Sequence, residues 1–174
     1  IEFALRTGRQ ERLIAITGTN GKSTTTALTE HILKQGGLSA RIGGNFGTPL
    51  TGLPNRGEDS IIVLELSSYQ LELTPSLRAE IRVILNITPD HLDRHGGWDG
   101  YVRAKQAILV TATPDDLLIL GPGDVLDRLS AETHESHKII RLDESNPAEH
   151  LDNSTLQGQH NQQNSAAARV SCRQ

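Results

Sequence analysis

The feature that most constrains the fold is a glycine-rich turn that stands between a strand-like run and a helix-like run. Residues 13–17 are apolar or β-branched without interruption, which is typical of a buried strand. The run 23–35 suits a helix, and two glycines follow it as a stop signal. The turn 18–22 joins the two runs. A strand, a tight turn and a helix in this order predict a unit of an α/β fold.

Strand-like and helix-like runs alternate along the rest of the chain. We expect further strands at 40–42, 61–64, 81–87, 117–120 and 138–142, and further helices at 98–110, 124–131 and 163–170. This alternation predicts a mainly parallel sheet with helices on both faces. Ligands of such sheets bind beyond the carboxyl ends of the strands, where the polar clusters of this sequence fall.

The bulk properties exclude several classes of protein. A chain of 174 residues suits one α/β domain. The net charge of −4 without a basic stripe argues against a nucleic-acid partner. No apolar run approaches the roughly 18–20 residues that cross a bilayer, so we expect no membrane insertion. One cysteine, Cys172, fits a reducing compartment, and we expect a cytoplasmic protein.

The chain has the marks of a piece of a longer protein. It contains no methionine, and its final helix-like run stops without a termination signal. We therefore expect residues 1–174 to be a domain of a larger polypeptide, and the lack of methionine leaves open whether internal residues are missing as well. The polar segment 131–157 is expected to be an exposed loop around one strand. We expect no metal role for its histidines, His134, His137 and His150.

The glycine-rich turn has the composition of a phosphate-binding loop. It is formed by Gly18, Thr19, Asn20, Gly21, Lys22, Ser23 and Thr24. Such a turn offers backbone N–H groups and a positive helix end to an anion. Lys22 can contact the β- and γ-phosphates, and Ser23 can ligate Mg²⁺. The match is incomplete, because Ile16 stands where the usual pattern has its first glycine. A plain glycine turn with a surface lysine is the alternative.

A carboxylate and a histidine follow two of the expected strands. Glu65 ends the run 61–64 and is placed where a nucleotide-bound Mg²⁺ needs an oxygen ligand. The alternative is a solvated glutamate at a strand end. His91 follows the strand 81–87. It can ligate a metal, carry a proton or cap a turn, and its position leaves these three roles open.

Lys105 occupies an unexpected place in the helix 98–110. It lies four residues after Tyr101 and three before Ile108, on the stripe expected to face the core. A lysine that snorkels to solvent is the ordinary explanation. The alternative is a buried amine with a lowered pKa, which is nucleophilic and can capture CO₂ as a carbamate.

Six stretches together resemble the Mur ligases and the folylpolyglutamate synthetases. They occur in the family's order at 17–23, 43–49, 64–71, 85–96, 101–105 and 158–164. The first stretch is similar to the family's nucleotide loop, which also lacks the first glycine. The stretch 64–71 resembles the branch of the family that adds D-glutamate, and it argues against the folate branch. The resemblance implies a P-loop-type mononucleotide-binding domain.

The resemblance implies a reaction and its cofactors. ATP, with Mg²⁺, would phosphorylate the carboxylate of UDP-N-acetylmuramoyl-L-alanine, and D-glutamate would attack the acyl phosphate, in the synthesis of a peptidoglycan precursor. Two flanking domains of the same polypeptide would bind the UDP moiety and D-glutamate, so this fragment should bind ATP without ligating. The alternatives are a folylpolyglutamate synthetase core and a nucleotide-sensing domain without synthetic activity.

The resemblance also implies roles for individual residues. Ser23 and Glu65 would hold one Mg²⁺, and His91 would help to bind a second. Lys105, as a carbamate, would serve the second ion. The remaining roles fall on three asparagines: Asn45 would orient the reacting phosphate, and Asn161 and Asn164 would reach the adenine side.

Overall fold

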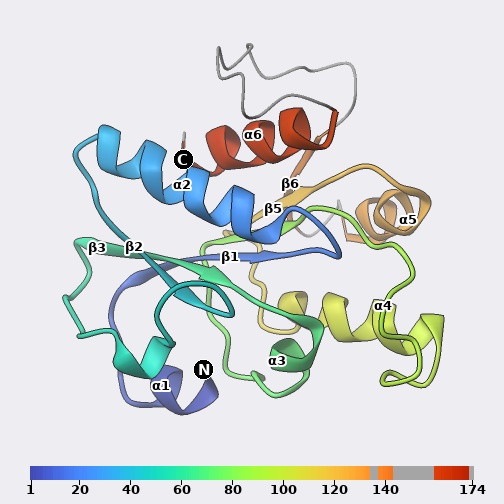
Figure 1. Ribbon diagram of the computed structural model, residues 1–174, viewed down its shortest axis with the longest axis horizontal. Helices are drawn as coiled ribbons and strands as arrows, with labels where there is room; N and C mark the ends of the chain where they lie inside the picture. The colour runs from blue at the N-terminus through green and yellow to red at the C-terminus, as the bar shows by residue number, and fades with distance from the viewer. Residues whose placement is uncertain (134–136, 143–158, 173–174) are drawn as a thin grey trace.

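The computed structural model describes residues 1–133, 137–142 and 159–172 (Figure 1). Its strands form one six-stranded sheet in the order β2-β3-β1-β4-β5-β6. Every neighbouring pair is parallel. The prediction of an α/β fold with a mainly parallel sheet is therefore confirmed.

The strands are β1 (Arg12–Thr17), β2 (Ser39–Gly44), β3 (Ser60–Glu65), β4 (Ile81–Ile84), β5 (Leu117–Leu120) and β6 (Lys138–Arg141). The α-helices are α1 (Glu2–Arg6), α2 (Lys22–Gln35), α3 (Ser68–Glu72), α4 (Trp98–Gln106), α5 (Asp124–Thr133) and α6 (Gln159–Cys172). Two 3₁₀ helices, η1 (Leu50–Gly52) and η2 (Ala107–Leu109), complete the described elements.

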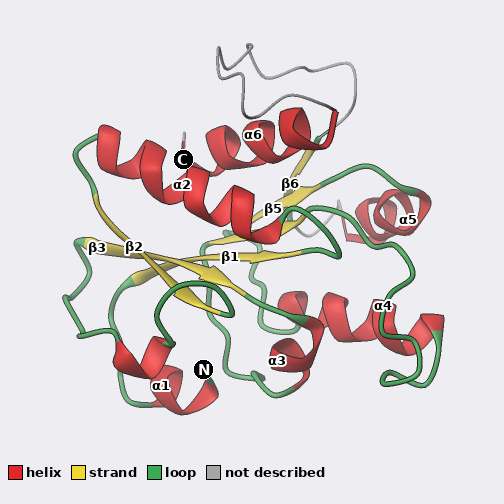
Figure 2. Ribbon diagram, in the orientation of Figure 1, coloured by secondary structure: helices red, strands yellow, loops and turns green. Residues whose placement is uncertain are grey.

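Helices cover both faces of the sheet. Figure 2 shows α2 and α6 above it and α1, α3 and α4 below it. Strand β1 serves both cores, because successive side chains of a strand point to opposite faces. Leu13 and Ala15 belong to one hydrophobic core, which also contains Leu126 of α5. Ile14 and Ile16 belong to the other, which lies on the side of α2 and α6.

The structure corrects several expected boundaries. The strand expected at 81–87 ends at Ile84, so the polar residues after it lie in a loop. The helix expected at 98–110 is α-helical only to Gln106 and then tightens into η2. Helices α1 and α3 were not expected, because each has only 5 residues, too few to show a helical period. His134 and His150 lie outside the described residues.

The strand order decides which loops meet. Strand β1 lies between β3 and β4, and β2 lies next to β3. Since all four run parallel, the segments that follow them emerge at the same edge of the sheet. These segments carry the expected phosphate loop, Asn45 and His91, and Glu65 ends β3 at the same edge.

Candidate functional site

The glycine-rich turn leads directly from β1 into α2. Gly21 is the N-cap of α2 and has a left-handed φ of 82°. A Cβ on Gly21 would lie 2.3 Å from the side-chain oxygen of Asn164. Glycine is therefore required both by the backbone conformation and by the close approach of α6. No side chain of the described residues caps α2, so its first-turn N–H groups face the edge of the sheet without a capping acceptor.

The side chain of Lys22 folds back over the turn. Its ammonium group donates to the carbonyl oxygens of Gly18 and Thr19, each at 2.9 Å. Burial lowers the pKa of Lys22, and the nearby carboxylates of Glu65 and Asp90 partly oppose this effect. A half-buried cation beside uncapped N–H groups at a helix N-terminus forms an anion-binding site.

Lys105 reaches the same turn from α4. Its side chain is 1% exposed, and Nζ donates to the carbonyl oxygen of Gly18 at 2.7 Å. It also lies 4.8 Å from the ring centroid of Tyr101. Burial, and then the charge of Lys22, lower the pKa of Lys105 to about 7, while Asp90 opposes the shift. The snorkelling interpretation is therefore wrong: the amine is buried, and its carbamylation stays a prediction.

Glu65 is buried at the carboxyl end of β3. The residue is only 1% exposed, which rules out a solvated strand-end glutamate. Its Oε1 accepts a hydrogen bond from the side-chain amide of Asn45 at 2.9 Å. Its Oε2 is buried and has no hydrogen-bond partner among the described residues. A buried carboxylate oxygen without a partner is costly, so this atom is suited to a cation.

The loop after β2 is shaped to reach Glu65. The backbone N–H of Asn45 donates to the carbonyl oxygen of Glu65 at 2.9 Å. Gly44 has a φ of 101°, and a Cβ there would lie 2.3 Å from the same carbonyl oxygen. Only glycine permits this approach, which brings Asn45 and Glu65 together.

His91 is exposed, unlike the buried Glu65. Its side chain is 53% exposed, with Nε2 3.5 Å from a carboxylate oxygen of Asp90. Its ring centroid is 5.5 Å from that of Tyr69. The residue has a positive φ of 50°. Within the described residues, no group of three or more His, Cys, Asp and Glu side chains could hold a metal ion.

His95, which received no role from the sequence, is more deeply placed than His91. Its side chain is 1% exposed. Its Nε2 is hydrogen-bonded to the hydroxyl of Ser68 at 3.0 Å, as donor or as acceptor according to the tautomer. Its other nitrogen lies 3.3 Å from a carboxylate oxygen of Glu72. The ring packs between Tyr69 and Tyr101, at centroid distances of 5.0 and 5.4 Å. His95 thus joins α3 to α4, and the Ser68 that it contacts is buried.

Asn86, just beyond β4, was also given no role by the sequence. Its side-chain oxygen accepts hydrogen bonds from the backbone N–H groups of Thr19 and Asn20, at 3.1 and 2.9 Å. Its side-chain nitrogen donates to the carbonyl oxygen of Asn20 at 3.1 Å. The strand expected at 81–87 included Asn86, and a polar residue near the carboxyl end of this apolar run is the signal that could have indicated it.

The remaining expected residues surround the turn. Ser23 is exposed in the first turn of α2, and Thr24 is partly buried behind it. Asn164 is buried against Gly21, while Asn161 is partly buried one turn earlier in α6. Asn164 therefore meets the phosphate loop itself. The arrangement as a whole can bind a polyanion at the start of α2 and a cation at Glu65.

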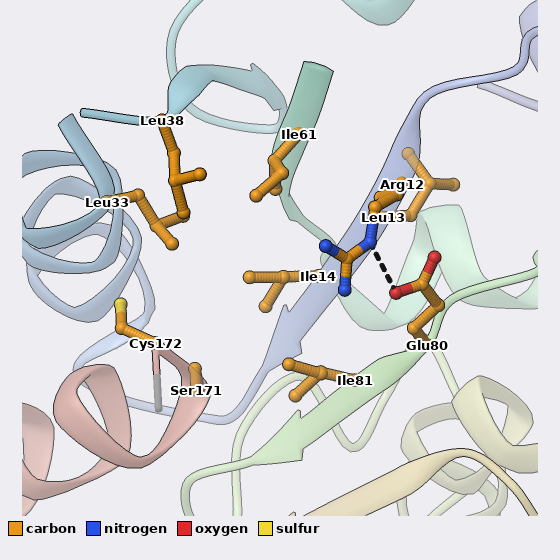
Figure 3. A pocket seen from close by; sticks show the side chains of 10 residues that line it. All are labelled: Arg12, Leu13, Ile14, Leu33, Leu38, Ile61, Glu80, Ile81, Ser171 and Cys172. Atoms are coloured by element: carbon orange, nitrogen blue, oxygen red, sulfur yellow. Dashed lines mark hydrogen bonds and ion pairs between the residues drawn. The ribbon is translucent and has the colours of Figure 1, made fainter. Parts of the chain in front are cut away.

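A separate apolar pocket lies at the opposite edge of the sheet (Figure 3). Its cavity volume is about 40 Å³, and it is lined by the first residues of β1, β3 and β4 and the last turns of α2 and α6. An ion pair between Arg12 and Glu80, at 2.7 Å, stands beside it. A space this small and apolar cannot hold a nucleotide. It is therefore distinct from the site around the turn.

Comparison with known proteins gives a consistent result. The sequence profile of the Mur ligase middle domain matches residues 16–172. The UDP-N-acetylmuramoylalanine–D-glutamate ligase of Zymomonas mobilis subsp. mobilis is 42% identical over 167 residues, covering 95% of this chain and 38% of that protein. The chain thus spans less than half the length of this relative.

Solved structures share the fold at lower identity. MurF from Acinetobacter baumannii matches with a TM-score of 0.74 and 22% identity, covering 98% of this chain and 44% of that chain. The MurF ligase from Thermotoga maritima in complex with ADP matches with a TM-score of 0.61 and 21% identity, covering 80% of this chain and 34% of that chain. At these identities the likeness concerns the fold.

Proposed function

The chain belongs to the Mur ligase family, and we propose that it is the ATP-binding middle domain of a ligase that adds D-glutamate to UDP-N-acetylmuramoyl-L-alanine. The observation that carries the proposal is the convergence of three features on one turn. Lys22 and Lys105 both donate to the carbonyl oxygen of Gly18. The negative charge of Glu65 is close enough to Lys22 to raise its pKa, against the effect of burial. The D-glutamate specificity is supported by the identity with a named D-glutamate ligase.

The phosphate loop fits the triphosphate of ATP. Gly21 leaves no side chain at the entrance of α2, and the first-turn N–H groups have no side-chain cap among the described residues. Lys22 is close enough to bond the loop carbonyls and can exchange these contacts for phosphate oxygens. Asn161 and Asn164 are proposed to serve the adenine side, with Asn164 packed beside Gly21.

The first Mg²⁺ ion fits the residues proposed for it. The buried Oε2 of Glu65 has no partner among the described residues and is an oxygen donor of the required kind. Ser23 is exposed in the first turn of α2 and offers a hydroxyl. When bound, Mg²⁺ would supply positive charge to the phosphate oxygens. Asn45 keeps the Glu65 carboxylate oriented through its 2.9 Å hydrogen bond.

The second ion proposed for His91 and Lys105 fits less directly. His91 is exposed, and an unmodified Lys105 amine is a poor ligand for Mg²⁺. The unmodified side chains of His91 and Lys105 therefore do not fit a second Mg²⁺ ion. A carbamate on Lys105 would change the donor set: the Nζ lone pair attacks the carbon of CO₂, and the nitrogen loses a proton. With a pKa of about 7, Lys105 has a neutral fraction able to react at physiological pH.

In the proposed reaction, a carboxylate oxygen of the acyl substrate attacks the γ-phosphorus of ATP, and ADP leaves. The amine of D-glutamate then attacks the carbonyl carbon of the acyl phosphate, loses a proton and displaces inorganic phosphate. Lys22 and the first-turn N–H groups neutralise charge on the transferred phosphoryl group. Asn45 is proposed to orient that group. These contributions are positioning and electrostatics rather than covalent chemistry.

Two further domains are part of the proposal. The chain covers 38% of its Zymomonas relative, which leaves room in that protein for other domains. We propose that an N-terminal domain binds the UDP moiety and a C-terminal domain binds D-glutamate. The described residues contain no helix long and apolar enough to cross a membrane. A cytoplasmic location is proposed from the substrates.

The test is an assay of the full-length protein for ADP release and amide formation. We expect amide formation and continued ADP release over many turnovers to require UDP-N-acetylmuramoyl-L-alanine and D-glutamate together. Turnover with a folate and glutamate instead would favour the folylpolyglutamate synthetase alternative. Nucleotide binding without any amide product would favour a nucleotide-sensing domain. Either of the last two results would overturn the proposed substrates.

A further inference from the structure

The side-chain amide of Asn86 is bonded to the first half of the phosphate loop on both its oxygen and its nitrogen. The oxygen accepts from the N–H groups of Thr19 and Asn20, and the nitrogen donates to the carbonyl of Asn20. The backbone carbonyl of Asn86 also accepts from the N–H of Thr19, at 3.0 Å. The amide group of Asn86 therefore acts as a pairing partner for the loop backbone beyond the end of β1.

This contact divides the loop into two halves with different tasks. The N–H groups of Thr19 and Asn20 point toward Asn86 and are already bonded. The N–H groups at the start of α2, after Gly21, have no intrahelical acceptor and no side-chain cap among the described residues. The backbone N–H groups that remain free to bind phosphate oxygens are therefore those of the second half. Their position depends on the first half, which Asn86 holds.

The hydroxyl of Thr19 strengthens the same connection. It accepts from the N–H of Thr88 at 3.0 Å and donates to the carbonyl oxygen of Thr88 at 3.1 Å or to the hydroxyl of Tyr101 at 3.0 Å. Gly18 permits close contact here, since a Cβ on it would lie 3.0 Å from the Cβ of Leu85. The loop is thus held against the segment 85–88 by the side chains of both Asn86 and Thr19.

We infer that Asn86 is a positioning residue for the nucleotide, whose side-chain amide holds the first half of the phosphate loop so that Lys22 and the first-turn N–H groups of α2 meet the phosphates. This inference rests on the proposed nucleotide site. Asn86 itself does not touch the phosphates, because its oxygen and its nitrogen are both engaged with the loop. Its effect is to keep the loop ordered before the nucleotide arrives, which lowers the entropic cost of binding.

The experiment compares the full-length protein with its Asn86→Ala and Asn86→Asp variants. Asn86→Ala removes every side-chain contact to the loop. Asn86→Asp can still accept from the two N–H groups but cannot donate to the carbonyl of Asn20. This variant replaces Asn86→Ala in the measurements if the alanine variant does not fold. Asn55→Asp is the matched control, because Asn55 accepts from the N–H of Gly57 at 3.1 Å in an exposed turn away from the site.

The measurements are ADP affinity by calorimetry and amide exchange by mass spectrometry. We expect Asn86→Ala to weaken ADP binding about tenfold, equivalent to the loss of about one good hydrogen bond. The loss of ADP affinity should be equally large with and without Mg²⁺, because the substitution removes no metal ligand. Exchange should accelerate in peptides that contain Thr19 and Asn20, and the KM for ATP should rise while kcat at saturation stays within about twofold.

Each remaining outcome overturns the inference in a recognisable way. Unchanged ADP affinity in a folded Asn86→Ala variant would show that the loop needs no such support. A large fall in melting temperature with unchanged affinity of the folded protein would make Asn86 a structural residue only. If the unmodified protein bound no ADP, the nucleotide site itself would be refuted, and the inference would fail with it.

Discussion

Lys22 and Lys105 donate hydrogen bonds to one acceptor, the backbone carbonyl oxygen of Gly18, at Nζ–O distances of 2.9 and 2.7 Å. Two ammonium groups this close repel each other, and the charge of Lys22 is one cause of the lowered pKa of Lys105. A neutral amine can still donate to Gly18 and keep its lone pair. The shared carbonyl therefore joins the proposed phosphate-binding lysine to the proposed carbamate site.

Replacing Lys22 should abolish nucleotide binding and leave the fold intact. The Lys22→Ala variant loses the charge that serves the phosphates, whereas the core contacts of α2 come from other residues. We expect at least about a hundredfold weaker binding of Mg·ATP by calorimetry, a loss of about 2.7 kcal/mol. Lys34→Ala is the control, because Lys34 lies on the same helix and pairs with Glu30 at the surface. Undiminished binding by Lys22→Ala would refute the assignment.

Replacing Glu65 should reveal a metal-dependent loss. The Glu65→Ala variant removes the buried oxygen that lacks a partner among the described residues. We expect nucleotide affinity to fall about tenfold or more in the presence of Mg²⁺ and to change far less in its absence. Titrations with and without Mg²⁺ decide the point, with the exposed Glu58→Ala as control. Equal losses under both conditions would count against a ligand role.

Replacing Lys105 should nearly eliminate ligation by the full-length enzyme, and small carboxylates should partly restore it. Alanine leaves a space where a carbamate would stand, and acetate or formate can supply the same two oxygens. Initial rates of Lys105→Ala are measured with acetate, formate and, for comparison, methylamine. Rescue by the amine alone would indicate that Lys105 acts as a cation. Little loss of activity would refute both roles.

The lowered pKa of Lys105 should make stability depend on pH. Its pKa falls from 10.5 to about 7 in the folded protein. Between these values the unfolded chain binds the extra proton, so the free energy of unfolding rises with pH. We expect a slope of up to about 1.4 kcal/mol per pH unit in this window, and its reduction in Lys105→Met. Urea unfolding of the nucleotide-free protein between pH 7 and pH 9.5, in CO₂-free buffer, tests this; equal slopes would contradict it.

The buried Arg82 should matter far more to stability than an exposed arginine on the neighbouring strand. Arg82 is 1% exposed and donates to Asp116 and to the carbonyl oxygens of Ile108 and Thr111. The Arg82→Ala variant should lose about 3–5 kcal/mol, because Asp116 and these carbonyls are left without their partner. Arg12→Ala, which breaks a pair exposed on both sides, should lose less than about 1 kcal/mol. Urea unfolding compares the two, and similar losses would contradict this account.

The sequence by itself determined the alternation of strands and helices and the position of the phosphate loop. The uninterrupted apolar run of β1 and the two glycines after α2 are local signals, because each depends only on residues that are neighbours in the sequence. It also indicated that Lys105 shares a helix face with Tyr101 and Ile108, both of which are buried.

Only the tertiary structure decided how these residues meet. The order β2-β3-β1-β4 places Glu65 and Asn86 on opposite sides of the phosphate loop, which no local pattern encodes. The same packing closes the space around Lys105 and Glu65 and leaves His91 exposed. The physical reason is that burial, and with it the pKa of Lys105 and the partnerless oxygen of Glu65, depends on neighbours distant in sequence.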